Sequence, residues 1–471
     1  MKHKFLFILL FSLVLEGMVT TQAVAGDYVH QVNTLIGTKG TGLTSGYLYP
    51  GATYPYGMVQ FTPSYFSKRS GFVINQLSGG GCEHMGNFPT FPVKGKLKMS
   101  PDNILNYRIN VSEEKGHAGY YEAMVQEDIK AKLTVTERTG MASYEYPADQ
   151  QYGTIIIGGG ISATPIEQAA IVITAPNKCE GYAEGGNFCG LRTPYKVYFV
   201  AEFDTDAFET GTWKREELMP NTTFAEGEYS GVYFTFDVNK KKNIQYKIGV
   251  SYVSVENARE NLKAENAEWD FQKIQNQAEA KWNHYLGMIE VEGTNPDRTT
   301  QFYTHLYRSF IHPNVCSDVN GEYMGADFRV HKSRSKHYTS FSNWDTYRTQ
   351  IQLLSMLDPE VASDIVISHQ LFAEQSGGSF PRWVMANIET GVMQGDPTPI
   401  LIANAYAFGA RNYDPKPIFK IMRKGAEEPG SKSQDVETRP GLKQYLDKGY
   451  YNASIQLEYT SADFAIGQFA L

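Results

Sequence analysis

The chain has little cysteine and no excess of positive charge. It contains 4 cysteines among 471 residues, and its formal net charge is −8. A nucleic-acid-binding protein usually carries a basic stripe, and none is found here. The cysteines have no second Cys or His at zinc-ligand spacing. These absences argue against a nucleic-acid partner and against metal binding through sulfur.

Cysteine pairing is left open by the sequence. In an oxidising compartment Cys179 and Cys189 would close a small loop, but buried free thiols are an equal alternative, because spacing alone does not fix connectivity. The remaining cysteines are Cys82 and Cys316.

Long apolar runs are absent after the N-terminus, so no membrane span is expected. Residues 1–25 have the features of a signal peptide: Lys2 and Lys4, an apolar run over residues 5–15, and Ala-Val-Ala at residues 23–25. The mature chain is expected to begin at Gly26. No cysteine lies directly after the apolar run, near the expected cleavage site, which argues against a bacterial lipid anchor. The sequence therefore predicts an exported protein.

The hydrophobic period changes once along the chain and predicts a multidomain β + α protein. Residues 26–255 alternate apolar and polar positions between turn signals, which is typical of an antiparallel β-sandwich. Residues 256–293 predict two linker helices and a short strand at 288–293, and residues 294–471 are mainly helical. Helices are expected at residues 297–312, 345–357, 360–374, 399–408, 415–425 and 457–471.

Two tryptophans beside charged residues are the first candidates for a site. Trp344 precedes Asp345, and Arg382 precedes Trp383, each pair at an expected helix end. An indole covers the apolar face of a sugar ring, while a carboxylate or guanidinium binds neighbouring hydroxyls. The alternative is that both tryptophans are core aromatics with an ion pair nearby.

Seven motifs in order extend over nearly all of the chain after the signal peptide. They are VNTLIGT, YPGATYPYGMVQFTP, SGGGCEHMGNFP, WDTYRTQ, GGSFPRW, ETGVMQGD and LEYTSADFAI. Together they resemble glycoside hydrolase family 92. The resemblance implies an exo-acting, calcium-dependent, inverting α-mannosidase that acts on N-glycans or mannans. It further implies a β-sandwich, linker helices and an (α/α)6 barrel, and a periplasmic or secreted location in a Gram-negative bacterium.

The resemblance also implies a mannose pocket between sandwich and barrel. Asp345 would bind sugar hydroxyls, Trp344 would form a wall, and Arg348 would orient Asp345 or contact the sugar. The cleft would also be lined by Arg382, Trp383, Gly81, Cys82, Glu83 and His84. For Arg348 the alternative is a structural bridge to Asp345, and for Glu83 and His84 it is a structural role.

No catalytic residue and no metal ligand can be matched in this chain. An inverting glycosidase needs an acid and a base carboxylate, and the family's acid Glu, base Asp and Ca²⁺ ligands lie further along. The last expected helix keeps an apolar face up to the final residue, without a stop signal. We expect a truncated barrel, with acid, base and Ca²⁺ ligands beyond Leu471, and an inactive chain.

Two other functions remain open. The chain is alternatively a non-catalytic mannose- or glycan-binding fragment or pseudo-enzyme. A third possibility is a hydrolase of another (α/α)6 family that uses Asp345, Glu389 and Asp396. Linkage specificity and oligomeric state are not predicted.

Overall fold

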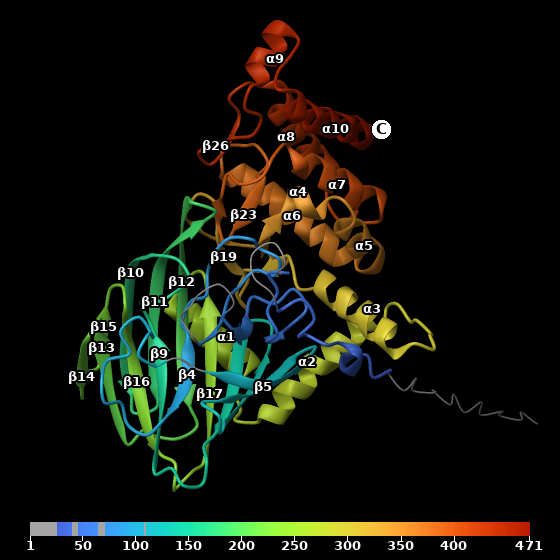
Figure 1. The fold of residues 1–471 in the computed structure, drawn as a ribbon. Helices are drawn as coiled ribbons and strands as arrows, with labels where there is room; N and C mark the ends of the chain where they lie inside the picture. Colours follow the sequence, from blue (N-terminus) through green and yellow to red (C-terminus); the bar gives the residue numbers. More distant parts are fainter. Residues whose placement is uncertain (1–25, 40–45, 65–70, 108–109) are drawn as a thin grey trace, which may run out of the picture.

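The computed structural model describes residues 26–39, 46–64, 71–107 and 110–471 (Figure 1). The predicted signal peptide, residues 1–25, lies outside these ranges. Within them, no helix combines the length and apolar character that crossing a bilayer requires.

Two antiparallel sheets form the N-terminal half. In spatial order, the first sheet consists of β1 (Ala52–Thr53), β2 (Gln60–Pro63), β3 (Phe72–Val73), β4 (Thr90–Lys94), β9 (Tyr152–Gly158), β16 (Ser230–Asp237), β13 (Glu209–Lys214) and β14 (Glu217–Pro220). The second consists of β15 (Phe224–Glu226), β10 (Ile166–Ala175), β11 (Lys178–Phe188), β12 (Leu191–Phe203), β17 (Asn243–Ser251), β8 (Thr139–Glu145), β7 (Ile129–Val135), β6 (Tyr120–Val125) and β5 (Val111–His117).

The core between the sheets is built from aromatic and β-branched residues of both. Burial alternates along β6, as expected for a strand with one face on a core. Phe72 of the first sheet stacks on Tyr144 of the second, with ring centroids 6.3 Å apart. Burying each such ring contributes about 1.5–3 kcal/mol. The predicted sandwich is confirmed.

Helices α1 (Val255–Glu265) and α2 (Phe271–Leu286) follow the sandwich and pack against its second sheet. Ser254 and Asp270 cap their N-termini by accepting backbone N–H bonds. Both linker helices were predicted. The strand expected at residues 288–293 is absent from the structure. This segment lacks a partner strand and its backbone instead bonds to the Tyr303 hydroxyl, at Ile289 O and Val291 N.

The remaining chain is mainly helical, which confirms the predicted fold class. Its helices are α3 (Pro296–Ser309), α4 (Asn343–Thr346), α5 (Gln350–Leu357), α6 (Pro359–Gln375), α7 (Pro397–Ala407), α8 (Pro415–Glu427), α9 (Leu442–Lys448) and α10 (Ala453–Ala470). Short strands connect them: β18 (Asn314–Val315), β19 (Glu322–Met324), β20 (Val330–Lys332), β21 (Tyr338–Thr339), β22 (Phe341–Ser342), β23 (Trp383–Met385), β24 (Ile388–Glu389), β25 (Lys432–Ser433) and β26 (Val436–Glu437). Several helices begin with proline, whose fixed φ suits the first turn.

The N-terminal segment joins the two halves. Val29 of the 3-10 helix η1 (Val29–Gln31), together with Tyr49 and Tyr56, contributes to the hydrophobic core of the helical half. The backbone carbonyl of Thr53 accepts a bond from Trp282 Nε1 at 2.7 Å, and the Thr53 hydroxyl lies 2.8 Å from that of Tyr307. These buried bonds hold strand β1 of the sandwich against helices α2 and α3.

Candidate functional site

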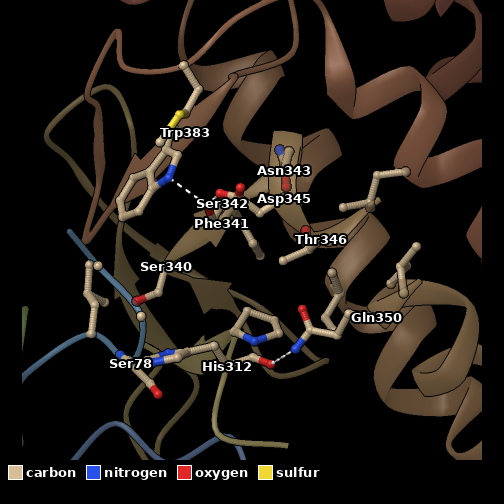
Figure 2. Close-up of a pocket in the computed structure, with 18 of the residues that line it drawn as sticks. Ser78, His312, Ser340, Phe341, Ser342, Asn343, Asp345, Thr346, Gln350 and Trp383 are labelled. Atoms are coloured by element: carbon tan, nitrogen blue, oxygen red, sulfur yellow. Dashed lines mark hydrogen bonds between the residues drawn. The ribbon is translucent and has the colours of Figure 1, made fainter. Parts of the chain in front are cut away.

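A cavity of about 400 Å³ opens where the sandwich loops meet the helical half (Figure 2). The sandwich contributes residues 77–82 and the β11–β12 tip at Phe188 and Cys189. The helical half contributes residues around His312, the segment that leads into α4, and Trp383. The cavity therefore has walls from segments that are far apart in sequence.

Trp383, Ser342 and Asp345 form one wall (Figure 2). Strands β22 and β23 pair Ser342 with Trp383, and Asp345 follows in the first turn of α4. Trp383 Nε1 donates to Ser342 Oγ at 2.7 Å, and Ser342 Oγ donates to an Asp345 carboxylate oxygen. The indole ring packs on Phe188, with centroids 4.5 Å apart, and is 4% exposed. Asp345 is exposed and free to accept further hydrogen bonds from a ligand.

The loop of residues 78–82, called the glycine loop, forms the rim opposite the wall of Trp383, Ser342 and Asp345. Ser78 N donates to His312 Nε2 at 2.7 Å, and Gly79 N donates to the Tyr47 carbonyl at 2.9 Å. Gly79 has φ +81°, and a Cβ on Gly80 would lie 2.8 Å from His84 Cε1. Glycine is therefore required at both positions.

A disulfide between Cys82 and Cys189 fastens this loop to the β11–β12 tip. The pairing of Cys179 with Cys189 that spacing suggested is wrong, because Cys179 lies buried as a free thiol inside β11. Cys316 is also free and buried. Cys82 and Cys189 both line the cavity, as does Gly81.

His84 and Glu83 do not line the cavity, contrary to the sequence-based expectation. His84 is fully buried; its Nε2 accepts the Leu77 N–H at 2.8 Å, and its Nδ1 donates to the Cys82 carbonyl at 2.7 Å. Burial lowers the pKa of His84 to about 4. Through these two hydrogen bonds the neutral His84 ring fixes the conformation of the loop between Leu77 and Cys82. Glu83 points to solvent at its outer side.

His312 is a cavity residue that the sequence did not reveal. Its Nδ1 donates to Asn314 Oδ1 at 2.7 Å while its Nε2 holds the glycine loop. Burial lowers the pKa of His312 to about 4. Gln350 was also missed; it donates to the carbonyl of His312 at 3.0 Å (Figure 2). No pattern around these two residues distinguishes them from ordinary polar positions.

Arg382 was expected in the cleft and is instead held away from it. Its guanidinium donates to the backbone carbonyls of Gly395 at 3.0 Å and Thr438 at 3.2 Å. These bonds link the backbone segments that contain Gly395 and Thr438. Trp383, expected at a helix end, begins strand β23.

Trp344 and Arg348 also lie outside the cavity lining. The Arg348 guanidinium covers the Trp344 ring at 4.9 Å and donates to the Tyr347 hydroxyl at 2.8 Å. The ion pairs among the described residues do not include one between Arg348 and Asp345. The orientation of Asp345 comes from Ser342 instead.

Glu389 and Asp396 are buried outside this cavity. Glu389 accepts backbone N–H bonds from Arg382, Trp383 and Gly391, and burial raises its pKa to about 6. Asp396 pairs with Arg439, Oδ2 to Nε, at 2.8 Å. Neither carboxylate faces the space in which Asp345 lies.

Asp345 is the one carboxylate on the described cavity wall. Calcium takes six to eight oxygen ligands, roughly, with several from carboxylates. The described lining therefore does not fit a calcium ion. It does fit a neutral polyol, because one indole edge, one carboxylate, and several hydroxyl and amide groups face the same space.

This arrangement of a β-sandwich, linker helices and a helical domain around a shared cavity is that of a two-domain carbohydrate-active protein. The glycosyl hydrolase family 92 N-terminal domain matches residues 31–251, and the family 92 catalytic domain matches residues 257–471. The chain belongs to glycosyl hydrolase family 92.

Solved structures of family members share the fold. A GH92 α-mannosidase from Bacteroides thetaiotaomicron is 25% identical with a TM-score of 0.84, over 94% of this chain and 62% of that one. A GH92 inverting mannosidase from the same organism is 25% identical with a TM-score of 0.82, over the same shares. An uncharacterized secreted glycosidase from Arthroderma benhamiae is 24% identical over 97% of this chain and 62% of its own length. The chain thus spans about three fifths of the length of these relatives.

Proposed function

We propose that this chain supplies the mannose-binding part of an exo-acting, inverting α-mannosidase that acts on mannose-containing glycans. The observation that carries the proposal is the hydrogen-bonded series Trp383–Ser342–Asp345 on the cavity wall. Family membership and the similarity to two mannosidases support the choice of mannose over other sugars. One of those relatives has been solved with mannoimidazole.

The residues of this chain would bind and orient the terminal sugar. Asp345 accepts hydrogen bonds from two neighbouring hydroxyls, which is a strong, charge-assisted contact. The edge of the Trp383 indole, whose ring packs on Phe188, contacts the apolar side of the sugar. Ser342 fixes the carboxylate, so less rotational freedom is lost when the sugar binds.

The chemical step needs groups that the described cavity wall does not provide. Inversion requires an acid and a base carboxylate, roughly 6.5–9.5 Å apart, on opposite sides of the bond. We place the acid Glu, the base Asp and the Ca²⁺ ligands in sequence outside this chain. The presence of one carboxylate, Asp345, supports that placement. It equally favours the second candidate function, a mannose-binding chain without hydrolysis.

Two measurements on the purified 471-residue chain test these proposals. Calorimetry should detect mannoimidazole binding, weakened in Asp345→Asn and unchanged in Glu83→Gln, whose side chain lies outside the cavity. Mannose release from α-mannobiosides should be absent. Turnover by this chain would refute the assignment of acid and base to other sequence, and unaltered binding by Asp345→Asn would refute the site.

Export is proposed on separate grounds. The disulfide Cys82–Cys189 is typical of oxidising compartments. One relative is described as secreted. We propose that residues 1–25 direct the protein to the periplasm or outside of a Gram-negative cell. N-terminal sequencing of the exported protein tests this, with Gly26 as the expected first residue.

A further inference from the structure

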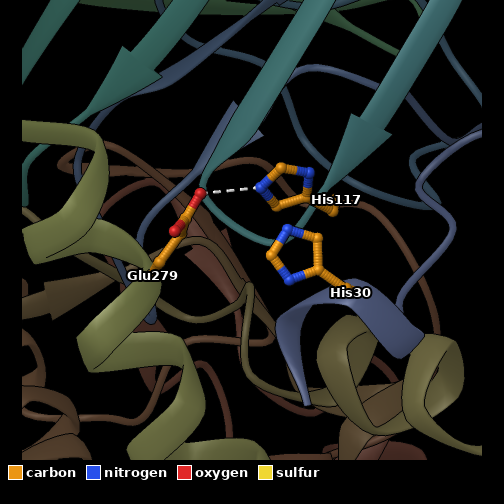
Figure 3. Close-up of side chains that lie close together, drawn as sticks. All are labelled: His30, His117 and Glu279. Carbon is orange, nitrogen blue, oxygen red and sulfur yellow. Dashed lines mark hydrogen bonds and ion pairs between the residues drawn. The ribbon is translucent and has the colours of Figure 1, made fainter. Parts of the chain in front are cut away.

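Two histidines and a glutamate meet at a junction of three segments, away from the cavity (Figure 3). His30 comes from η1, His117 from the end of β5, and Glu279 from α2. These elements belong to the N-terminal segment, the sandwich and the linker helices. The cluster therefore lies where a crosslink would join all three.

The geometry places three possible ligand atoms together. One ring nitrogen of each histidine and one carboxylate oxygen all lie within 4.8 Å of one another. His117 Nε2 and Glu279 Oε1 are 2.8 Å apart, and both side chains are mostly buried, at 17% and 18% exposure. His30 is 54% exposed, and its ring centroid lies 4.6 Å from that of His117.

Neighbouring side chains hydrogen-bond to these groups, as the neighbours of metal ligands do in other proteins. Asp27 lies 2.6 Å from His30 Nδ1, which fixes the proton there and leaves Nε2 as an acceptor. Figure 3 shows the other ring nitrogen of His30 directed toward His117 and Glu279. Gln275 donates to Glu279 Oε1 at 2.7 Å. A carboxylate on the distal nitrogen of a ligating histidine is a frequent feature of metal sites.

We propose that His30, His117 and Glu279 bind a divalent transition metal ion of the zinc type. Two imidazole nitrogens and one carboxylate oxygen form a donor set that suits Zn²⁺, with water as the fourth ligand. Ca²⁺ and Mg²⁺ prefer oxygen ligands alone and would not be retained. The role is structural, because the site is separate from the cavity wall.

Binding requires a small rearrangement at one residue. Metal–ligand bonds of about 2.0–2.2 Å place tetrahedral ligand atoms about 3.3 Å apart. His117 and Glu279 are already near that separation. His30 must move its ring inward, and its exposure leaves room for this. On binding, His117 Nε2 no longer donates to Glu279, and the neutral ring carries its proton on Nδ1.

Zn²⁺ titration of the full chain, purified without a histidine tag, tests the site. We expect one equivalent to bind by calorimetry and to raise the Tm, while Ca²⁺ and Mg²⁺ have no effect. His30→Asn should weaken Zn²⁺ binding at least tenfold without unfolding the protein, since His30 is exposed. His305→Asn, an exposed histidine on α3, is the matched control and should bind normally.

The proposal is overturned if the unaltered protein binds no Zn²⁺, or if His30→Asn binds it as tightly. In either case the cluster is only a His117–Glu279 hydrogen bond with a histidine beside it. A Glu279→Gln variant gives a second measurement. It keeps a hydrogen-bonding side chain but removes the anionic ligand, and it should lower affinity and remove the rise in Tm.

Discussion

Trp383 and Asp345 are joined through a single hydroxyl, because Ser342 Oγ accepts from the indole at 2.7 Å and donates to the carboxylate. The pairing of β22 with β23 sets the first bond, and the start of α4 sets the second. The position of the carboxylate at the cavity thus depends on a strand register as well as on a helix.

Ser342→Ala should weaken mannoimidazole binding about 5- to 30-fold, or about 1–2 kcal/mol. The variant leaves Trp383 Nε1 without its partner and lets Asp345 rotate away. Calorimetry measures the affinity. Ser461→Ala, an exposed serine on α10, is the control and should bind as the unaltered chain does. Equal affinity in Ser342→Ala would show that the hydroxyl does not position the carboxylate.

Breaking the Cys82–Cys189 disulfide should lower stability by about 2–4 kcal/mol. The bond spans 107 residues, so its loss frees a long loop in the unfolded chain. The Tm of the Cys82→Ala/Cys189→Ala variant should fall, and so should that of the unaltered protein with reductant. Reductant should not change the double variant further. If reductant lowered the Tm of the double variant, Cys179 or Cys316 would have to be the reducible group instead of Cys82 and Cys189.

Stability should fall as the pH is lowered from about 6.5 toward 4. Burial lowers the pKa of His84, His312 and His369 to about 4 and that of His337 to about 3. In this window these histidines bind more protons in the unfolded chain than in the folded one, so each removes up to about 1.4 kcal/mol of stability per pH unit. Above about pH 6.5 these histidines are neutral in both states and cause no loss of stability.

Two carboxyl groups oppose this trend over a narrower range. Burial raises the pKa of Glu389 and of Asp364 to about 6, so the folded state holds protons that the unfolded state has lost. Their contribution grows as the pH falls through 6. Urea midpoints at pH 7, 6 and 5 measure the net effect. His312→Gln, which keeps an acceptor for Ser78 N–H, should flatten the profile, and an unchanged slope would contradict the buried neutral histidine.

Arg439→Met should destabilise the protein by about 3–5 kcal/mol. Arg439 bonds to buried Asp396 at 2.8 Å, and removing it leaves that carboxylate without a counter-charge. Asp396→Asn/Arg439→Met should recover part of the loss in urea unfolding. The exposed partner, Asp463, gives the control: Asp463→Asn should cost about 0–1 kcal/mol. A small effect of Arg439→Met would mean that Asp396 is neutral in the fold.

The sequence predicts the layers of this fold well, and for a physical reason. Period-two alternation reports which face of a strand is buried, and the change to a helical period after residue 255 marks α1 and α2. The strand predicted at residues 288–293 was wrong, because the local sequence does not show whether a partner strand is present. The backbone of this segment bonds to the Tyr303 hydroxyl instead.

The site was harder to predict because its contacts join distant segments. Trp383 and Asp345 were chosen from their residue types, and both line the cavity. Arg382 was chosen in the same way, but it bonds to carbonyls that no local pattern indicates. The Cys82 partner depends on the arrangement of two loops in space. His312 has no distinguishing neighbours in sequence, although it holds the glycine loop.

The glycine loop is fastened on both sides, by Cys189 in the sandwich and by His312 in the helical half. Neither half would form the cavity if produced alone, because both contribute lining residues. A chimera that exchanged the sandwich between two family members would exchange one rim of the pocket with it, so ligand preference should be inherited from both parents.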